Sequence, residues 1–255
     1  AQFGDLNNDG ALDLYVVNQS GSSPSGFREN VNEITFARGQ WHRVEIYQKQ
    51  GASNNGVVRV WVNGVLAPDR SDTDTPSTPV ANVTISGIGG GVGDSKDQAD
   101  FMKFDRIRIS RPGSGTAPSE PGPATTLLQE GFEDGSLAGR GWYDGTTPLL
   151  STTEHVTGSL RSIEFKFNAG ATTPTAASTL RRKFTPSDSV YLRYYVKYSA
   201  NWVGSQRAYH PHEFHFLTSR DGDWSGLSFN RLTVYVEQTG GTPLIGIQDG
   251  ANVDQ

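Results

Sequence analysis

The first residues whose spacing could support chemistry lie near the start of the chain, in FGDLNNDGALDLYVVN at residues 3–18. Oxygen-bearing side chains alternate in this stretch, and Gly10 permits a sharp bend among them. Calcium takes about six to eight oxygen ligands, which suits such a loop. The predicted calcium ligands come from five residues: Asp5, Asn7, Asp9, Ala11 (through its carbonyl oxygen) and Asp13. Val16 stands where an EF-hand has its glutamate, so the loop is not a complete EF-hand, and an Asx-rich turn without metal is the alternative.

A second chemically versatile stretch is AYHPHEFHF at residues 208–216, which holds three of the five histidines. Histidine is a common ligand of transition metals. In a strand, however, His210 and His212 lie on one face, whereas Glu213 and His215 lie on the other. We therefore expect His212 to lie in or near the core and Glu213 and His215 to face a groove. Metal binding by His210 and His212 is the alternative.

Four stretches have the alternation of a strand, so that one face can be assigned to the core and the other to a groove: 41–47, 57–63, 190–198 and 229–237. If they share one sheet, a single face gathers Arg43, Glu45, Tyr47, Arg59, Trp61, Tyr191, Arg193, Tyr195, Lys197, Arg231, Thr233, Tyr235 and Glu237. Aromatic rings stack on the apolar faces of sugars, and Arg or Lys pairs with uronate carboxylates. The pattern therefore predicts a groove for an acidic polysaccharide. A solvated face with cross-strand ion pairs is the alternative.

The chain also resembles a known family, the concanavalin-like jelly rolls, which include laminin-G-like and polysaccharide-lyase-like domains. Its first half is similar to their late and closing strands, in GQWHRVEIYQKQ, NNGVVRVWVNGVL and FMKFDRIRIS. Its second half resembles their opening and middle strands, in LLQEGFEDGSLAGRGW, YLRYYVKYSANWVG and HPHEFHFLTSRDG. The resemblance implies an all-β jelly-roll sandwich in circularly permuted order, or one whose strands are shared between neighbouring chains. The loop at 5–13 is itself similar to the calcium loops of integrin-type propeller repeats and dockerins.

Polysaccharide-lyase-like jelly rolls imply a chemistry for the groove. β-Elimination needs a group that neutralises the uronate carboxylate, a base for the C5 proton and an acid for the leaving oxygen. The resemblance implies Arg193 or Arg231 for the first role, His215 for the second, and Tyr235 or Tyr195 for the third. The residues expected to bind the polymer are Tyr195, Lys197, Glu213, Arg59, Trp61 and Tyr47.

Two further expectations concern carboxylates. A hydrolase would need two carboxylates across the groove, and Glu213 with Glu237 is the pair to test. Concanavalin-like domains also imply a second calcium ion, for which the matching residues are Glu130, Glu133, Asp134 and Asp105.

Composition narrows the class of protein. The 255 residues carry a formal net charge of −5, which favours neither nucleic-acid binding nor an anionic membrane as partner. No apolar run approaches the roughly 20 residues that span a bilayer. The absence of cysteine excludes disulfides and thiolate chemistry, and with a chain that starts AQF it suggests a mature secreted or extracellular protein.

A proline-rich stretch, RPGSGTAPSEPGPATT at 111–126, predicts a linker between residues 1–110 and 127–255. Either one chain closes a single permuted sandwich around this linker, or each half is completed by a neighbouring chain, which would build a fibre. A fragment of tandem domains is a third possibility. Strands are predicted near residues 12–18, 32–37, 41–49, 56–63, 82–88, 101–110, 127–132, 160–168, 178–184, 190–199, 212–218, 229–237 and 243–248.

The sequence therefore predicts a secreted, calcium-stabilised jelly roll that binds an acidic polysaccharide and cleaves it if the lyase resemblance extends to chemistry. The alternative is a structural subunit that polymerises head-to-tail by sharing strands.

Overall fold

The computed structural model describes residues 2–4, 13–15, 28–35, 37–49, 57–66, 80–86, 96, 98–113, 124–176, 179–202, 212–217, 231–239 and 242–249. Regular structure in this part of the chain is strand, apart from one short 3₁₀ turn, η1 (Ala138–Arg140). The prediction of an all-β protein is confirmed. No described helix is long and apolar enough to cross a membrane.

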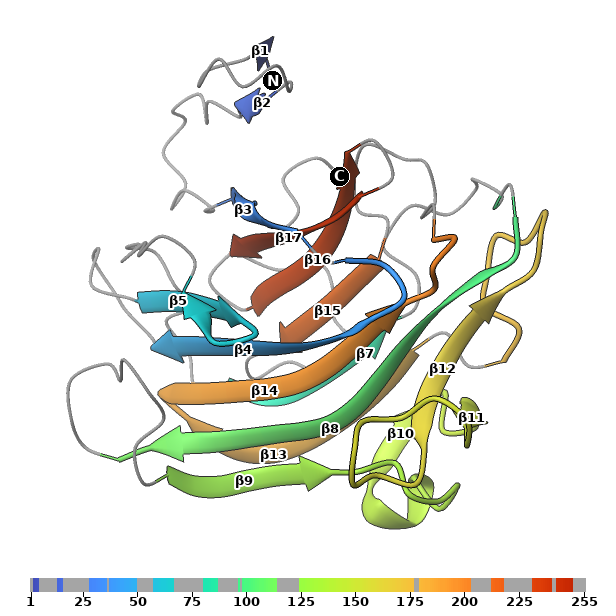
Figure 1. Ribbon diagram of the computed structural model, residues 1–255. Coiled ribbons are helices and arrows are strands. Elements are labelled where there is room, and N and C mark those ends of the chain that lie inside the picture. The colour runs from blue at the N-terminus through green and yellow to red at the C-terminus, as the bar shows by residue number, and fades with distance from the viewer. Residues whose placement is uncertain are drawn as a thin grey trace.

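The strands form two large antiparallel sheets and one small one (Figure 1). The eight-stranded sheet contains, in spatial order, β11 (Leu149–Ser151), β12 (Ser162–Phe167), β8 (Asp100–Pro112), β14 (Ser189–Tyr198), β4 (Trp41–Lys49), β5 (Val57–Val62) and β6 (Val65–Leu66), with β9 (Ala124–Glu130) paired to β8. The seven-stranded sheet contains β10 (Trp142–Asp144), β13 (Thr179–Ser187), β7 (Val80–Ser86), β15 (His212–Leu217), β16 (Arg231–Thr239), β17 (Thr242–Asp249) and β3 (Arg28–Thr35). β1 (Gln2–Gly4) and β2 (Asp13–Tyr15) pair separately.

The two large sheets pack as a β-sandwich around one continuous apolar core. Alternation explains the core, because every second residue of a strand points inward. Val44 and Ile46 of β4, and Leu192 and Val196 of β14, are almost fully buried there, together with Ile85 of β7 from the opposite sheet.

Each large sheet contains strands from both sides of residues 111–126, and strands of one side lie between strands of the other. In the eight-stranded sheet β8 lies between β12 and β14, and in the seven-stranded sheet β7 lies between β13 and β15 (Figure 1). Core residues such as Ile46 and Leu192 therefore come from both halves of the sequence. Within one chain, each half supplies strands that the other half needs as hydrogen-bonding neighbours.

The ends of the predicted linker differ from expectation, because they are strand. β8 runs through Pro112 and β9 begins at Ala124, and Arg111 pairs with Thr125. β8 and β9 thus form an antiparallel pair, and the chain between their ends, residues 114–123, lies outside the described residues.

Candidate functional site

The side of the eight-stranded sheet that faces away from the core carries charged residues on adjacent strands. Leu192 pairs with Ile109 of β8 and Ile46 of β4, and all three lie in the core. One residue further along, Arg193 pairs with Arg108 on one side and Glu45 on the other. Alternation therefore sets Arg193 and Arg108 directly opposite each other on the outer side of the sheet.

A β-bulge in β8 adds a third arginine to this place. From Arg193 to Tyr195 on β14 the partner strand runs from Arg108 to Asp105, so β8 contains one extra residue. Arg106 lies in this bulge with a φ of 48°, a left-handed conformation that is uncommon for a residue other than glycine. The bulge brings both Asp105 and Arg106 to the outer side, because Phe104 before it and Ile107 after it are core residues.

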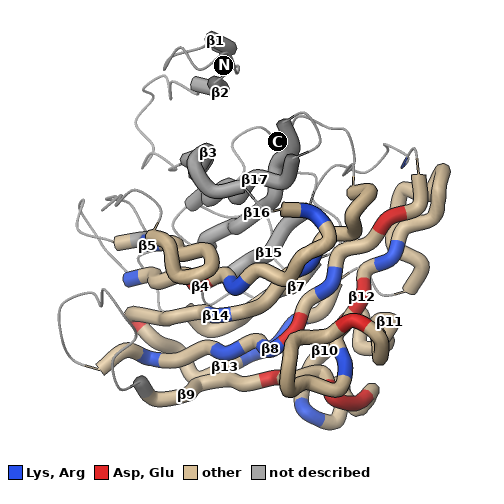
Figure 2. The backbone as a smooth tube through the Cα atoms, in the orientation of Figure 1, with Lys and Arg blue, Asp and Glu red and all other residues tan. Residues whose placement is uncertain are grey.

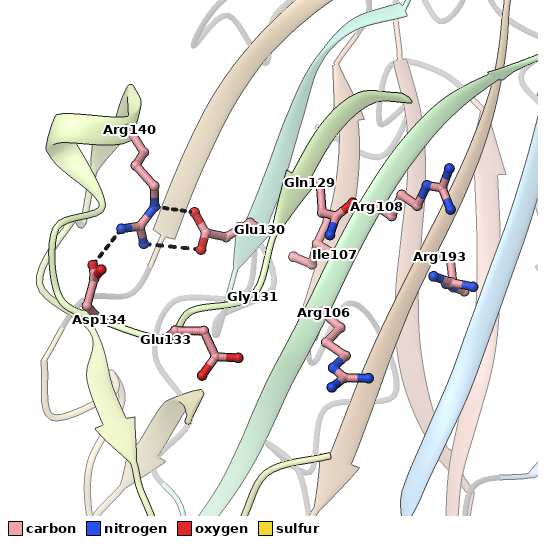
Figure 3. Close-up of a pocket in the computed structure, with 10 residues that line it drawn as sticks. All are labelled: Arg106, Ile107, Arg108, Gln129, Glu130, Gly131, Glu133, Asp134, Arg140 and Arg193. Carbon is pink, nitrogen blue, oxygen red and sulfur yellow. Dashed lines mark hydrogen bonds and ion pairs between the residues drawn. The ribbon is translucent and has the colours of Figure 1, made fainter. Parts of the chain in front are cut away.

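These three arginines line a pocket of about 560 Å³ (Figure 3). Its other lining residues come from β8, β9 and the segment that follows β9: Ile107, Gln129, Glu130, Gly131, Glu133, Asp134 and Arg140. Basic positions recur along β8, where Lys103, Arg106, Arg108 and Arg111 follow one another (Figure 2). We call this the arginine pocket.

The arginine pocket holds positive charge that the described residues do not neutralise. Among those residues, none of Arg106, Arg108 and Arg193 forms an ion pair. Arg106 donates from Nε to Ser159 Oγ at 2.8 Å, and Arg108 donates from Nη2 to Thr126 Oγ1 at 2.9 Å. The Nε atoms of Arg108 and Arg193 are buried without a hydrogen-bond partner. Like charges opposite each other and buried donors without acceptors both destabilise a fold, so the pocket is suited to an anion.

On the wall of the pocket opposite β14, in contrast, Glu130, Asp134 and Arg140 are paired with one another. Buried Glu130 accepts four hydrogen bonds: from Phe132 N at 2.7 Å, Trp142 Nε1 at 2.9 Å, and Arg140 Nε and Nη2 at 2.8 and 3.1 Å. Arg140 also donates from Nη1 to Asp134 Oδ1 at 2.5 Å, and this bond lowers the pKa of Asp134 (Figure 3). Arg140 thus neutralises Glu130 and Asp134, two of the three carboxylates in the pocket lining.

A segment between β11 and β12 lies against the outer side of β8. Asp105 is completely buried under it and accepts hydrogen bonds from Val156 N at 2.9 Å and Ser159 Oγ at 3.1 Å. Burial raises the pKa of Asp105 against these hydrogen bonds. Leu160 N donates to Glu133 Oε2 at 2.7 Å, so the segment reaches the rim of the arginine pocket.

The carboxylates expected to hold a second calcium ion therefore have other partners. Glu130 and Asp134 bind Arg140, Asp105 binds Val156 and Ser159, and Glu133 binds the amide of Leu160. The described residues contain no group of three or more metal-ligating side chains.

The polymer-binding residues expected on β14, β4 and β5 do share one side of the eight-stranded sheet, but not all are accessible. Tyr47 and Trp61 are only 3% and 7% exposed and form a small buried cluster with Tyr191. They offer no open ring face, so the expected stacking platform is wrong in this structure. Arg59, Tyr195 and Lys197 are half-buried, and Lys197 Nζ pairs with Glu154 Oε1 at 2.6 Å.

The expectation of one groove is also wrong, because β15 and β16 belong to the seven-stranded sheet. Arg193 and His215 therefore lie in different sheets. Alternation along a strand predicts which residues share a face, but it carries no information on which sheet the strand joins.

The remaining lyase candidates stay together on adjacent strands. Glu213 pairs with Tyr235, His215 with Thr233 and Leu217 with Arg231. His215 also pairs with Thr84 of β7. The side chains of β15 and β16, and those of Glu237 and His212 with them, lie outside the described part.

The predicted calcium loop falls largely outside the described residues, which omit 5–12. The strands on either side of it are described, and Asp13, the last predicted ligand, pairs with Gly4. Asp5, Asn7, Asp9 and Ala11 therefore belong to a connection between two antiparallel strands, and their role stays a prediction. His210 also lies outside the described residues, and His212 begins β15.

Sequence reasoning found Arg193 but missed Arg106 and Arg108. The signal was present in DRIRIS, where arginine and isoleucine alternate as expected for a strand with one face in the core. What the sequence could not show is that β8 pairs with β14, which brings Arg108 opposite Arg193.

We predict that Glu130→Gln lowers the free energy of unfolding by about 2–3 kcal/mol, because it leaves Arg140 and buried donors without their charged acceptor. Urea unfolding measures the change. Glu133→Gln is the matched control, since Glu133 is exposed on the same segment and accepts a single amide hydrogen bond. Equal effects of the two substitutions would show that the Glu130 cluster does not hold this wall.

No model of a known protein family matches the chain, and no curated protein is similar to it. The functional assignment therefore depends on the geometry of the arginine pocket.

Proposed function

We propose that the chain is a carbohydrate-binding β-sandwich that recognises an acidic polysaccharide through the arginine pocket. The observation that carries the proposal is the cross-strand pair Arg108 and Arg193, whose buried Nε atoms have no acceptor and no carboxylate partner among the described residues. A planar carboxylate accepts two parallel hydrogen bonds from a guanidinium group, so a uronate is a suitable partner for these arginines.

A uronate suits the pocket better than a simple anion because the lining is chemically mixed. Glu133 and Gln129 can accept hydrogen bonds from sugar hydroxyl groups, while the arginines take the carboxylate. The volume of about 560 Å³ lies within the range of ligand sites, and the pocket belongs to the open side of a sheet, where a polymer can enter and leave.

The proposal extends to the type of β-sandwich and the order of its strands. The sandwich would be a concanavalin-like jelly roll with circularly permuted order, residues 1–110 supplying its late strands and 127–255 its early and middle strands. Support comes from the quoted stretches and from the presence of strands of both halves in each of the two large sheets. Secretion to the outside of the cell, where such polysaccharides occur, belongs to the same proposal.

We predict that Arg193→Gln and Arg108→Gln each weaken binding of glucuronan or alginate about tenfold, which is about 1.4 kcal/mol. Isothermal titration calorimetry measures the affinity, with a neutral glucan as the ligand that should not bind. Lys166→Gln is the control, because it removes the same charge from an exposed position on β12. If all three variants bind the acidic polymers as the wild type does, the arginine pocket is not the site.

Calcium is proposed for the loop at 5–13, as a stabilising ion separate from the arginine pocket. The alternating ligands Asp5, Asn7 and Asp9 support it, as does the antiparallel pairing of Gly4 with Asp13 around them. We predict one calcium site by calorimetric titration of the metal-free protein, weakened at least about tenfold in Asp9→Asn because a carboxylate ligand is lost. Unchanged calcium binding in Asp9→Asn would remove the loop as the site.

Cleavage by β-elimination is a second candidate activity, and the arrangement of β15 and β16 supports it. Arg231, His215 and Tyr235 occupy register positions on two adjacent strands, with Glu213 opposite Tyr235. Arg231 would neutralise the uronate carboxylate, His215 would remove the C5 proton and Tyr235 would protonate the leaving oxygen.

We expect glucuronan or alginate to yield an unsaturated product, followed by its ultraviolet absorbance. His215→Ala should abolish this signal without weakening binding at the arginine pocket. If the wild type yields no unsaturated product, cleavage is excluded and only the binding function remains.

The structural alternative is a fibre in which neighbouring chains share strands. It requires filaments in negative-stain micrographs, and monodisperse single-chain particles with and without calcium would exclude it.

A further inference from the structure

We propose that the arginine pocket is one end of an elongated groove along β14, whose other end is Lys197, and that Glu154 occupies that end in place of a second carboxylate of the polymer. This inference rests on the proposed function and specifies how that site contacts successive sugars of a polymer. In this role Glu154 competes with a carboxylate of the ligand for Lys197.

The floor of the groove follows from alternation along β14. Arg193, Tyr195 and Lys197 lie on the outer side of the strand, while Tyr194 and Val196 between them are core residues. Arg193 and Lys197 are four residues apart, which is about 14 Å along an antiparallel strand at about 3.4 Å per residue. Arg193 and Lys197 are thus far enough apart to contact different sugar rings of one polymer.

One wall of the groove is the segment between β11 and β12. It is fastened to β8 at three points: Asp105 accepts from Val156 N, Arg106 donates to Ser159 Oγ, and Lys103 pairs with Glu154. The segment therefore covers β8 but leaves Tyr195 and Lys197 of β14 partly exposed beside it. A linear ligand can lie along β14 with this segment at its side.

The two lysines at the Lys197 end of the groove differ in their ion pairs. Buried Lys103 is paired with Glu154 and also with Glu164 at 3.3 Å, so its charge stays balanced if Glu154 leaves. Among the described residues Lys197 pairs only with Glu154, at 2.6 Å. A ligand carboxylate that reaches Lys197 therefore competes with the carboxylate of Glu154 for the charge of this lysine.

Glu154 is placed so that such displacement is feasible. Its side chain is 33% exposed, the most accessible of the four charged groups in this cluster. It lies in the connection between β11 and β12, outside the strand pairing, and its backbone is held by hydrogen bonds with Ser151 Oγ and Ser162 Oγ. The side chain can swing away while the two sheets keep their pairing.

The test compares glucuronic acid with oligoglucuronates from dimer to hexamer by calorimetric titration. For Glu154→Gln we expect about tenfold tighter binding of the hexamer, with the affinity for the monosaccharide unchanged, because the short ligand reaches only the arginine pocket. Lys197→Gln should weaken hexamer binding and spare the monosaccharide. Thermal unfolding of each variant checks that the fold is retained.

Glu164→Gln is the matched control, since it removes the same charge from the same cluster but pairs with Lys103 rather than Lys197. Equal strengthening by Glu164→Gln, or no strengthening of hexamer binding by Glu154→Gln, overturns the inference. If Arg193→Gln changes binding of neither ligand, the proposed function fails as well. If Arg193→Gln weakens both while Glu154→Gln has no effect, only the role of Glu154 fails.

Discussion

The antiparallel pairing of β8 with β14 is the constraint on which the rest of this molecule depends. Both strands lie in the middle of the eight-stranded sheet, and each buries one side in the core. Their charged residues therefore have only the outer side available. The register then sets Arg108 opposite Arg193, and the bulge at Arg106 adds a third guanidinium group. The pocket is thus a direct consequence of how the core is assembled.

The charged residues around the pocket fall into two groups, one with hydrogen-bonding partners and one whose buried donors have none among the described residues. On one wall of the pocket, Glu130 and Arg140 satisfy each other and fasten Trp142 and the backbone of Phe132. On the β8 and β14 side, two arginines keep buried Nε atoms without acceptors. Because a fold satisfies most of its buried polar groups, these donors support the ligand that we propose for the pocket. The paired residues Glu130 and Arg140 hold the wall of the pocket in place, whereas Arg108 and Arg193 are the residues that we propose to bind the ligand.

For three aromatic residues, the sequence predicted the side of the sheet correctly but suggested an accessibility that the structure does not have. Tyr47, Trp61 and Tyr191 alternate with core residues, as a sugar-stacking surface would require, yet they are buried together on the outer side. Their alternation indicated the correct side of the sheet and not their exposure. Exposure depends on what covers a residue, and that information is spread over the whole chain.

The sequence alone determined the all-β class, the position of most strands and the side of each strand that faces inward, because these properties follow from a period of two residues within a short stretch. Arg193, Tyr195 and Lys197 were found in this way. β1, β6, β10 and β11 escaped prediction because two or three residues are too few to show alternation. Only the tertiary structure decided that β15 joins a different sheet from β14, that Arg108 faces Arg193, and that Glu154 reaches Lys197. These are contacts between residues distant in the chain, and the period of one strand contains no information about its neighbour.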